Sequence, residues 1–147
     1  MRFFFDENIS PRVVEPLRPI YRQHHFESMH DQQWAQLRGT DDRDLLDTLQ
    51  TTFDVFVTGD KSQLKDHRPS LVESGLHWIG VRDPQAKGVR GIAALSAALL
   101  AGLPHALDHI VGLPPGEASW IVIKGVPGQA SQRVSVMDVR TGQKKSA

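Results

Sequence analysis

The sequence predicts an α/β fold built on a mostly parallel, doubly wound sheet, and three observations support this class. Short apolar runs typical of buried strands alternate with segments of helical spacing. The strand-like runs are residues 3–5, 23–29, 53–58 and 77–81. Aspartates follow three of these runs, and doubly wound sheets carry their sites beyond the carboxyl ends of the strands.

Capping residues and apolar spacing predict the first two helices. Ser10 can cap a helix that begins at the next residue, and Pro16 should shorten or kink that helix. Thr40 or Asp41 can cap the second helix. Its buried stripe is then formed by Leu45, Leu46 and Leu49.

The C-terminal part is expected to hold helical segments and a hairpin. Residues 91–103 have the apolar spacing of a core helix, and Pro104 is expected to begin a separate helical piece. Two alternating runs, 119–124 and 133–139, are joined by a segment rich in glycine and proline. Together they predict an antiparallel β-hairpin extension.

Length and composition indicate a single domain. The 147 residues are 39% hydrophobic and 23% charged, which is the composition of a folded globular chain rather than a disordered one. We expect one domain over residues 1–140, with a core at 1–103 and a helix and hairpin extension at 104–140. Residues 141–147 are expected to form a disordered tail.

Charge and cysteine content restrict the possible partners and compartment. The 17 basic and 17 acidic residues cancel, so no global positive field attracts nucleic acid, although a local basic patch stays open. The absence of cysteine excludes disulfides and thiolate zinc sites and fits a reducing compartment. The expected apolar helix at 91–103 is too short to span a bilayer. Without a signal-peptide pattern at the N-terminus, a cytoplasmic location with no membrane partner is expected.

Two aspartates at strand ends predict a site. Asp6 follows the first strand and Asp60 follows the third, so parallel strands would bring the two carboxylates to one edge. Carboxylates that converge repel one another unless a cation joins them, and hard cations such as Mg²⁺ or Mn²⁺ prefer oxygen ligands. A metal-dependent phosphoryl-transfer site follows as the leading hypothesis, although both aspartates also suit simple turns.

Residues near these aspartates extend the candidate site. Thr58 can bond a ligand or a carboxylate, and Lys61 can neutralise phosphate charge. Asp83 follows the fourth strand, where a turn role is equally compatible with its position. Among the acids at the start of the second helix, capping explains one or two, and one acid could complete the site. These acids are Asp41, Asp42 and Asp44.

Three segments resemble a bacterial family of PIN-like domains with the fold of toxin ribonucleases. Residues 5–11, Phe-Asp-Glu-Asn-Ile-Ser-Pro, are similar to its Asp-Glu-Asn-Leu-Ser-Pro opening. Residues 39–46 resemble its Gly-x-Ser-Asp-x-x-Ile-Leu helix start. Residues 56–61 resemble its Val-Leu-Val-Thr-x-Asp-x-Asp-Phe strand end. Order and spacing agree over residues 1–83.

This resemblance implies a three-layer α/β/α domain that hydrolyses RNA with Mg²⁺ or Mn²⁺, as the toxin of a toxin–antitoxin pair held by a cognate antitoxin. It selects Asp42 rather than Asp41, and it implies that Asp6, Asp42 and Asp60 hold the metal. Glu7 and Asn8 match the family's neighbours of the first acid. With the residues chosen above on their own chemistry, the candidate site has Asn8 and Lys61 in catalysis, Glu7 and Asp83 at the metal, and Thr58, Lys61 and Arg82 at the substrate.

The chain also departs from the family pattern. Ser62 and Gln63 stand where the family often has Asp-Phe, so the fourth acid is Asp83, Asp66 or none. Residues 104–140 have no counterpart in the resemblance. They can pack on the sheet edge, pair with a second subunit as a homodimer, or hold a partner.

Two other functions remain open at the level of sequence. One is a metal-dependent phosphatase or phosphoacceptor domain, with Asp6 or Asp54 as the phosphorylated residue. The other is a non-catalytic PIN-like module that binds a protein and keeps its acids only as helix caps.

Overall fold

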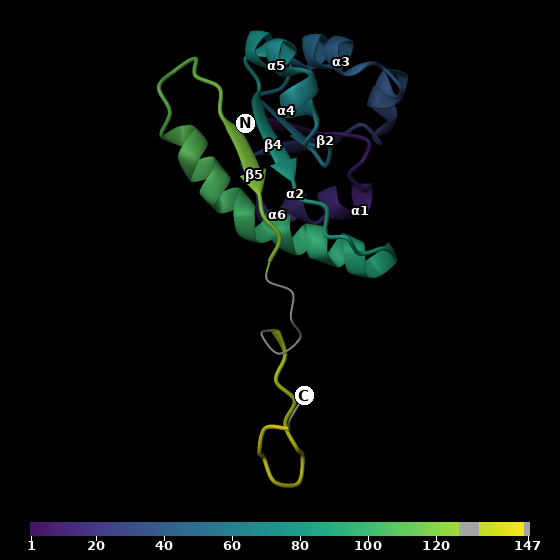
Figure 1. Cartoon of the computed structure of the whole chain (residues 1–147), viewed down its shortest axis with the longest axis vertical. Coiled ribbons are helices and arrows are strands. Elements are labelled where there is room, and N and C mark those ends of the chain that lie inside the picture. The colour runs from purple at the N-terminus through teal and green to yellow at the C-terminus, as the bar shows by residue number, and fades with distance from the viewer. Residues whose placement is uncertain (127–132, 146–147) are drawn as a thin grey trace.

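A five-stranded, all-parallel sheet forms the centre of the molecule in a computed structural model that describes residues 1–126 and 133–145 (Figure 1). The strand order is β2-β1-β3-β4-β5, so the chain reverses its direction of winding between β1 and β3. The elements are β1 (Arg2–Phe5), α1 (Pro11–Val14), α2 (Leu17–Ile20), β2 (His25–Ser28), η1 (Gln32–Leu37), α3 (Asp42–Leu49), β3 (Val55–Thr58), α4 (Gln63–Asp66), α5 (Arg68–Ser74), β4 (His77–Val81), α6 (Gly88–Val111) and β5 (Trp120–Ile123).

Helices cover both faces of this sheet, which confirms the α/β class. Phe3 and Phe5 of β1 point into a core shared with α1, α2 and α6. Phe4, between them, points to the opposite face and packs with η1, α3 and α5. Successive side chains of a strand face opposite sides of the sheet, so a run of three phenylalanines serves two cores at once.

The caps at the first helices agree with the sequence prediction. Ser10 accepts a hydrogen bond from the backbone N–H of Arg12, at 3.2 Å from its Oγ. Pro16 divides the segment into the two short helices α1 and α2. Asp41 caps α3, because its Oδ1 accepts the backbone N–H of Arg43 at 2.8 Å. Three short helical elements, η1, α4 and α5, were not predicted.

The predicted break at Pro104 is wrong, because α6 runs through this residue as one 24-residue helix. Proline cannot donate to the carbonyl four residues before it, which belongs to Leu100. The hydroxyl of Tyr21, after α2, donates to that carbonyl oxygen at 3.2 Å. A distant side chain therefore supplies the bond that the proline removes, and the helix continues across the predicted boundary at 103/104.

α6 is long and apolar enough to cross a membrane by length and composition alone. The prediction of a helix too short for this is therefore wrong. One side of α6 packs on the sheet, as a core helix does, through Ala98, Leu99, Leu103, Ala106 and Ile110. Gly102 lets the helix approach β5, since a Cβ there would lie 2.7 Å from Ile123.

The predicted antiparallel hairpin is also wrong. Its first run forms β5, which pairs parallel with β4 in the register Trp78↔Trp120 to Val81↔Ile123. Residues 133–139 form no strand, and only an isolated antiparallel bridge joins Met137 to Lys144. Residues 127–132, expected as the hairpin turn, lie outside the part of the chain that the structure describes. An alternating run fits a parallel edge strand as well as a hairpin arm, so its partner was misassigned.

Candidate active site

The strongest candidate site lies where the winding of the sheet reverses. In doubly wound sheets the crevice at this switch point, beyond the carboxyl ends of the strands, is the usual place for a ligand. β1 and β3 are neighbours here, in parallel register from Phe3↔Val55 to Phe5↔Val57. The carboxyl ends of β1 and β3 therefore lie side by side, as the sequence predicts, with Asp6 directly after β1 and Thr58 at the end of β3.

Hydrogen bonds hold Asp6 in a fixed orientation. Its side chain is buried, with 7% of the residue exposed. The hydroxyl of Thr58 donates to Asp6 Oδ2 at 2.9 Å, and the backbone N–H of Glu7 donates to Oδ1 at 2.8 Å. The carboxylate therefore has a partner on each oxygen and keeps lone pairs for a further ligand.

Asn8 joins the two strand ends together. Its amide nitrogen donates to Thr58 Oγ1 at 3.3 Å, and its amide oxygen accepts the backbone N–H of Gly59 at 2.9 Å. Thr58 Oγ1 also accepts the backbone N–H of Asp60 at 3.0 Å. The Asn8 amide thus holds the two loops together, and its role in catalysis stays a prediction.

The pKa of the Asp6 carboxyl is raised above its ordinary value of 3.8. Burial is the largest cause, because it removes water from the charged form, and the negative charges of Asp42 and Glu7 add to it. The hydrogen bonds from Thr58 and from the Glu7 backbone act in the opposite direction and only partly offset it. The charge of Asp42, at the start of α3, is thus a smaller cause of the raised pKa of Asp6 than burial is.

Asp42 has a histidine partner that sequence reasoning missed. His67, at the junction of α4 and α5, places Nε2 at 3.3 Å from Asp42 Oδ2. The spacing of this histidine from the others matches no common zinc pattern, so the sequence gives it no role. Asp42 and His67 are linked by no local motif, so only the folded chain brings His67 to the site.

The other predicted acids form local turns. Asp60 Oδ1 accepts the backbone N–H of Ser62 at 3.0 Å and the hydroxyl of Ser62 at 2.5 Å. Asp83 Oδ1 accepts the backbone N–H of Gln85 at 2.8 Å. Asp66 is exposed at the end of α4. Asp60 stays tied to the site through its backbone, whereas no contact joins Asp83 or Asp66 to Asp6 within residues 1–126 and 133–145.

Exposed side chains surround this edge. Glu7 follows Asp6, and its backbone oxygen lies 2.7 Å from His30 Nε2, after β2. Lys61 and Arg82 are exposed just after β3 and β4, as expected for groups that meet a ligand from solvent.

Asp54 lies at the opposite, amino-terminal edge, where its Oδ2 accepts the backbone N–H of Arg2 at 2.8 Å. This position removes Asp54 from the candidate site.

The donor set fits a hydrated hard cation. In the part of the chain that the structure describes, no group of three or more histidine, aspartate or glutamate side chains could hold a metal ion. Mg²⁺, however, usually keeps several waters and binds through one or two carboxylates together with substrate phosphates. Asp6, which is buried, and Asp42, whose charge acts on Asp6, are the two carboxylates that could take this part.

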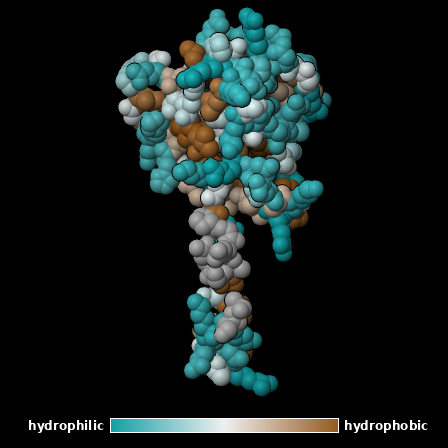
Figure 2. Space-filling model, viewed as in Figure 1, coloured by the Kyte–Doolittle hydropathy of each residue, from teal (hydrophilic) through white to brown (hydrophobic). Residues whose placement is uncertain are grey.

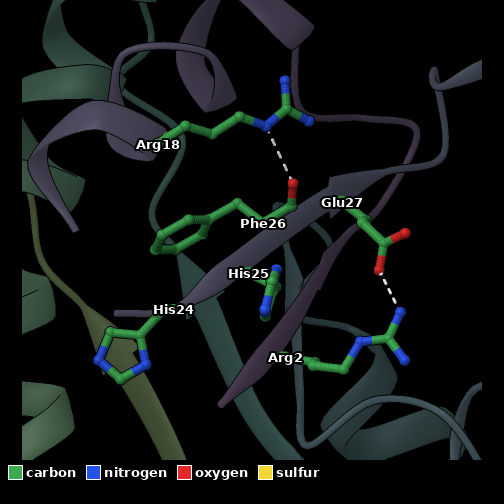
Figure 3. Close-up of a pocket in the computed structure, with 6 residues that line it drawn as sticks. All are labelled: Arg2, Arg18, His24, His25, Phe26 and Glu27. Carbon is green, nitrogen blue, oxygen red and sulfur yellow. Dashed lines mark hydrogen bonds and ion pairs between the residues drawn. The ribbon is translucent and has the colours of Figure 1, made fainter. Parts of the chain in front are cut away.

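Among the described residues, two of the hollows lie away from Asp6, Asp42 and Asp60. One, of about 550 Å³, lies along β2 and is lined by Arg2, Arg18, His24, His25, Phe26 and Glu27 (Figure 3). Its polar groups pair mostly within the protein: Arg18 Nε with the Phe26 carbonyl at 3.0 Å, and Arg2 with Glu27 at 2.7 Å. The other, of about 670 Å³, lies between α6 and β5. Neither hollow contains a residue of the predicted site.

The fold and the site together define a doubly wound α/β domain with a buried acid at its switch point. The chain belongs to the PIN-like domain family, whose model matches residues 1–81, more than half of the 147 residues. Proteins of this family are often nucleases. No match was found among curated proteins or among solved structures.

Proposed function

We propose that this chain is a metal-dependent ribonuclease that cleaves phosphodiester bonds at the carboxyl edge between β1 and β3. The observation that carries the proposal is the buried Asp6 carboxylate at the switch point of the sheet, held by the Thr58 hydroxyl at 2.9 Å. Burial raises the pKa of Asp6, and the charge of Asp42 adds to that rise. A site that concentrates negative charge away from water favours a divalent cation. Membership of the PIN-like family supports the choice of nuclease chemistry.

Asp6 and Asp42 would hold Mg²⁺ or Mn²⁺, with Asp60 as a candidate third ligand. When bound, such an ion supplies positive charge for the scissile phosphate and lowers the pKa of a bound water. Thr58 acts as a positioning residue, because its hydroxyl fixes Asp6 Oδ2 at 2.9 Å and receives the backbone of Asp60. His67 would orient Asp42, since its Nε2 lies 3.3 Å from Asp42 Oδ2.

Two cations would bind the substrate. Lys61 and Arg82 are exposed just after β3 and β4, at the same edge as Asp6. Lysine and arginine are the usual partners of phosphate oxygens, and at this edge they offset the repulsion between acids and RNA. The neighbouring phosphates of the strand would therefore lie over the ends of β3 and β4, with the scissile one nearest Asp6.

The test compares two aspartates on the same helix. Asp42→Asn should lower the rate of Mn²⁺-dependent cleavage of a labelled single-stranded RNA by about 100-fold or more, because it removes one of the two carboxylates. Asp47→Asn is the matched control. Asp47 is exposed on α3 and has the same charge, so its variant should cleave at the wild-type rate.

Calorimetric titration with Mn²⁺ gives the second readout. Wild type and Asp47→Asn should bind the ion, and Asp42→Asn should bind it more weakly. Equal cleavage by both variants would remove Asp42 from the mechanism. A wild-type protein that neither cleaves RNA nor binds Mn²⁺ at millimolar concentration would contradict the proposal and favour the non-catalytic module.

A further inference from the structure

The zero net charge of the chain hides a separation of charge along the sequence. Residues 1–123 hold 12 of the 17 basic residues and 16 of the 17 acidic ones, a net charge of −4. Residues 124–147 hold five basic residues and one acidic residue, a net charge of +4. The body that carries the candidate site is therefore acidic, and the compensating positive charge lies in one C-terminal segment.

This segment leaves the body at the same edge as the candidate site. β5 is parallel to the other strands, so its carboxyl end lies at the edge where Asp6 follows β1. Figure 1 shows residues 133–145 beyond that end of β5, apart from the helices and strands. Three strand spacings of about 4.8 Å separate β5 from β1, or roughly 14 Å. A polynucleotide strand stacked as in a B-form helix, with about 3.4 Å per nucleotide, covers this distance in about four nucleotides, and a more extended strand needs fewer.

Exposed basic residues lie at the strand ends between the Asp6 site and the C-terminal basic segment. Beyond the Asp6 site, each successive strand end carries a basic residue within three positions. Lys61 follows β3, Arg82 follows β4 and Lys124 follows β5, and all three residues are exposed. The row leads from the acidic site toward the basic segment. Positive charge along the path of the phosphate backbone is typical of surfaces that bind single strands.

The C-terminal turn exposes three cations while the one acid of the segment is engaged. Asp138 Oδ1 accepts the backbone N–H groups of Arg140 and Thr141 at 2.8 and 3.1 Å. The backbone of Val136 accepts the N–H of Lys145 at 2.7 Å, which closes a short antiparallel turn. Arg140, Lys144 and Lys145 are exposed on this turn, and Figure 2 shows it as largely hydrophilic.

We propose that Lys124, Arg140, Lys144 and Lys145 form a basic arm that binds the phosphate backbone of single-stranded RNA and extends the path of Lys61 and Arg82 away from the cleavage site. The inference rests on the proposed ribonuclease function and adds the direction in which the substrate runs. The contacts are to phosphates, so the arm raises affinity without reading sequence. It also offsets the repulsion between RNA and the acidic body.

The test measures binding of a labelled, unstructured RNA of about 20 nucleotides to the full chain in EDTA, by fluorescence anisotropy at several KCl concentrations. The variant replaces Lys124, Arg140, Lys144 and Lys145 with glutamine. Its Kd at about 0.1 M KCl should rise about tenfold or more. The slope of log K against log salt should fall in magnitude by up to about 2.8, since each lost phosphate contact on a single strand removes about 0.7.

Two control variants separate charge from other roles of the segment. Val134, Val136 and Val139 are exposed, and their replacement by threonine keeps both shape and charge. This variant should bind RNA within about twofold of wild type, because the phosphate contacts are retained. The charge-retaining variant Lys124→Arg, Arg140→Lys, Lys144→Arg and Lys145→Arg should keep the wild-type salt slope.

Two results would overturn the inference. One is a glutamine variant with the wild-type Kd and salt slope. The other is a threonine variant that loses as much affinity as the glutamine variant, which would assign the segment to an apolar partner such as a protein. Binding in EDTA does not depend on cleavage. A wild type that fails to cleave RNA with Mn²⁺ would therefore contradict the proposed function while leaving the arm intact, and the two failures are distinguishable.

Discussion

At the scale of the residue, the burial of Asp6 gives the site its pH dependence. Folding raises the pKa of this carboxyl above its ordinary value of 3.8, so the native state binds the proton more tightly than the unfolded chain does. The contribution of Asp6 to the free energy of unfolding is therefore fully present below about pH 3.8. It is lost as the pH rises through the folded pKa, because the charged form is then held in a desolvated place.

Asp6→Asn removes this titration and should change how stability depends on pH. The free energy of unfolding of the variant minus that of wild type should increase between about pH 4 and about pH 7, because only wild type loses the contribution. Urea unfolding in EDTA at several pH values measures this difference. Asp47 is exposed, so the free energy of unfolding of Asp47→Asn minus that of wild type should not show this increase with pH. A difference for Asp6→Asn that stays constant over this range would show that Asp6 is not destabilised by its surroundings.

The site itself was predictable only where its residues follow strands directly. Asp6 and Thr58 meet because their strands are neighbours, and the position of a residue just after a buried run is visible in sequence. The pairing of Asp42 with His67 depends on how α3 packs beside α5, the helix that directly follows His67. The engagement of the Asn8 amide with Gly59 was likewise invisible, because it depends on the distance between two loops.

At the scale of the element, α6 shows how a long-range contact overrides a local rule. Pro104 would normally end or kink a helix, at a cost of about 3 kcal/mol. Here the hydroxyl of Tyr21, 79 residues before Leu100, donates to the carbonyl that the proline leaves without an N–H partner. The local sequence pattern was sufficient to predict the strands β1, β3 and β4. It could not predict a helix whose continuity depends on a tyrosine in another segment.

Tyr21→Phe should destabilise the protein by about 0.5–1.5 kcal/mol, because it removes the donor to Leu100 without changing the ring. Chemical unfolding measures this loss. The second substitution, Pro104→Ala, restores a backbone N–H for the same carbonyl, so Tyr21→Phe should cost less in the Pro104→Ala background. Equal costs in both backgrounds would show that the hydroxyl does not compensate for the proline.

At the scale of the whole molecule, folding and charge belong to different parts of the chain. The buried hydrophobic residues of the described segments lie between Phe3 and Ile123, in one sheet with a core on each face. The segment after β5 carries the positive charge and exposes Val134, Val136, Met137 and Val139. The stability of the fold thus depends on residues 1–123, whose strands and helices the sequence pattern largely predicted. The positive charge that balances the acidic body lies after β5. The proposed role of these residues follows from the edge of the sheet at which β5 ends, which the sequence alone does not show.

A chain that ends after Val126 should therefore keep the melting temperature of the full chain within about 3 °C, because the buried core lies before this point. Differential scanning calorimetry of both proteins measures the shift. A chain that ends after Gly116 is the control and should be markedly less stable, since it loses β5 and the buried Ile123 that packs against α6. A fall of about 10 °C or more in the chain that ends after Val126 would mean that later residues contribute to the folded core, and the separation of stability from charge would then be wrong.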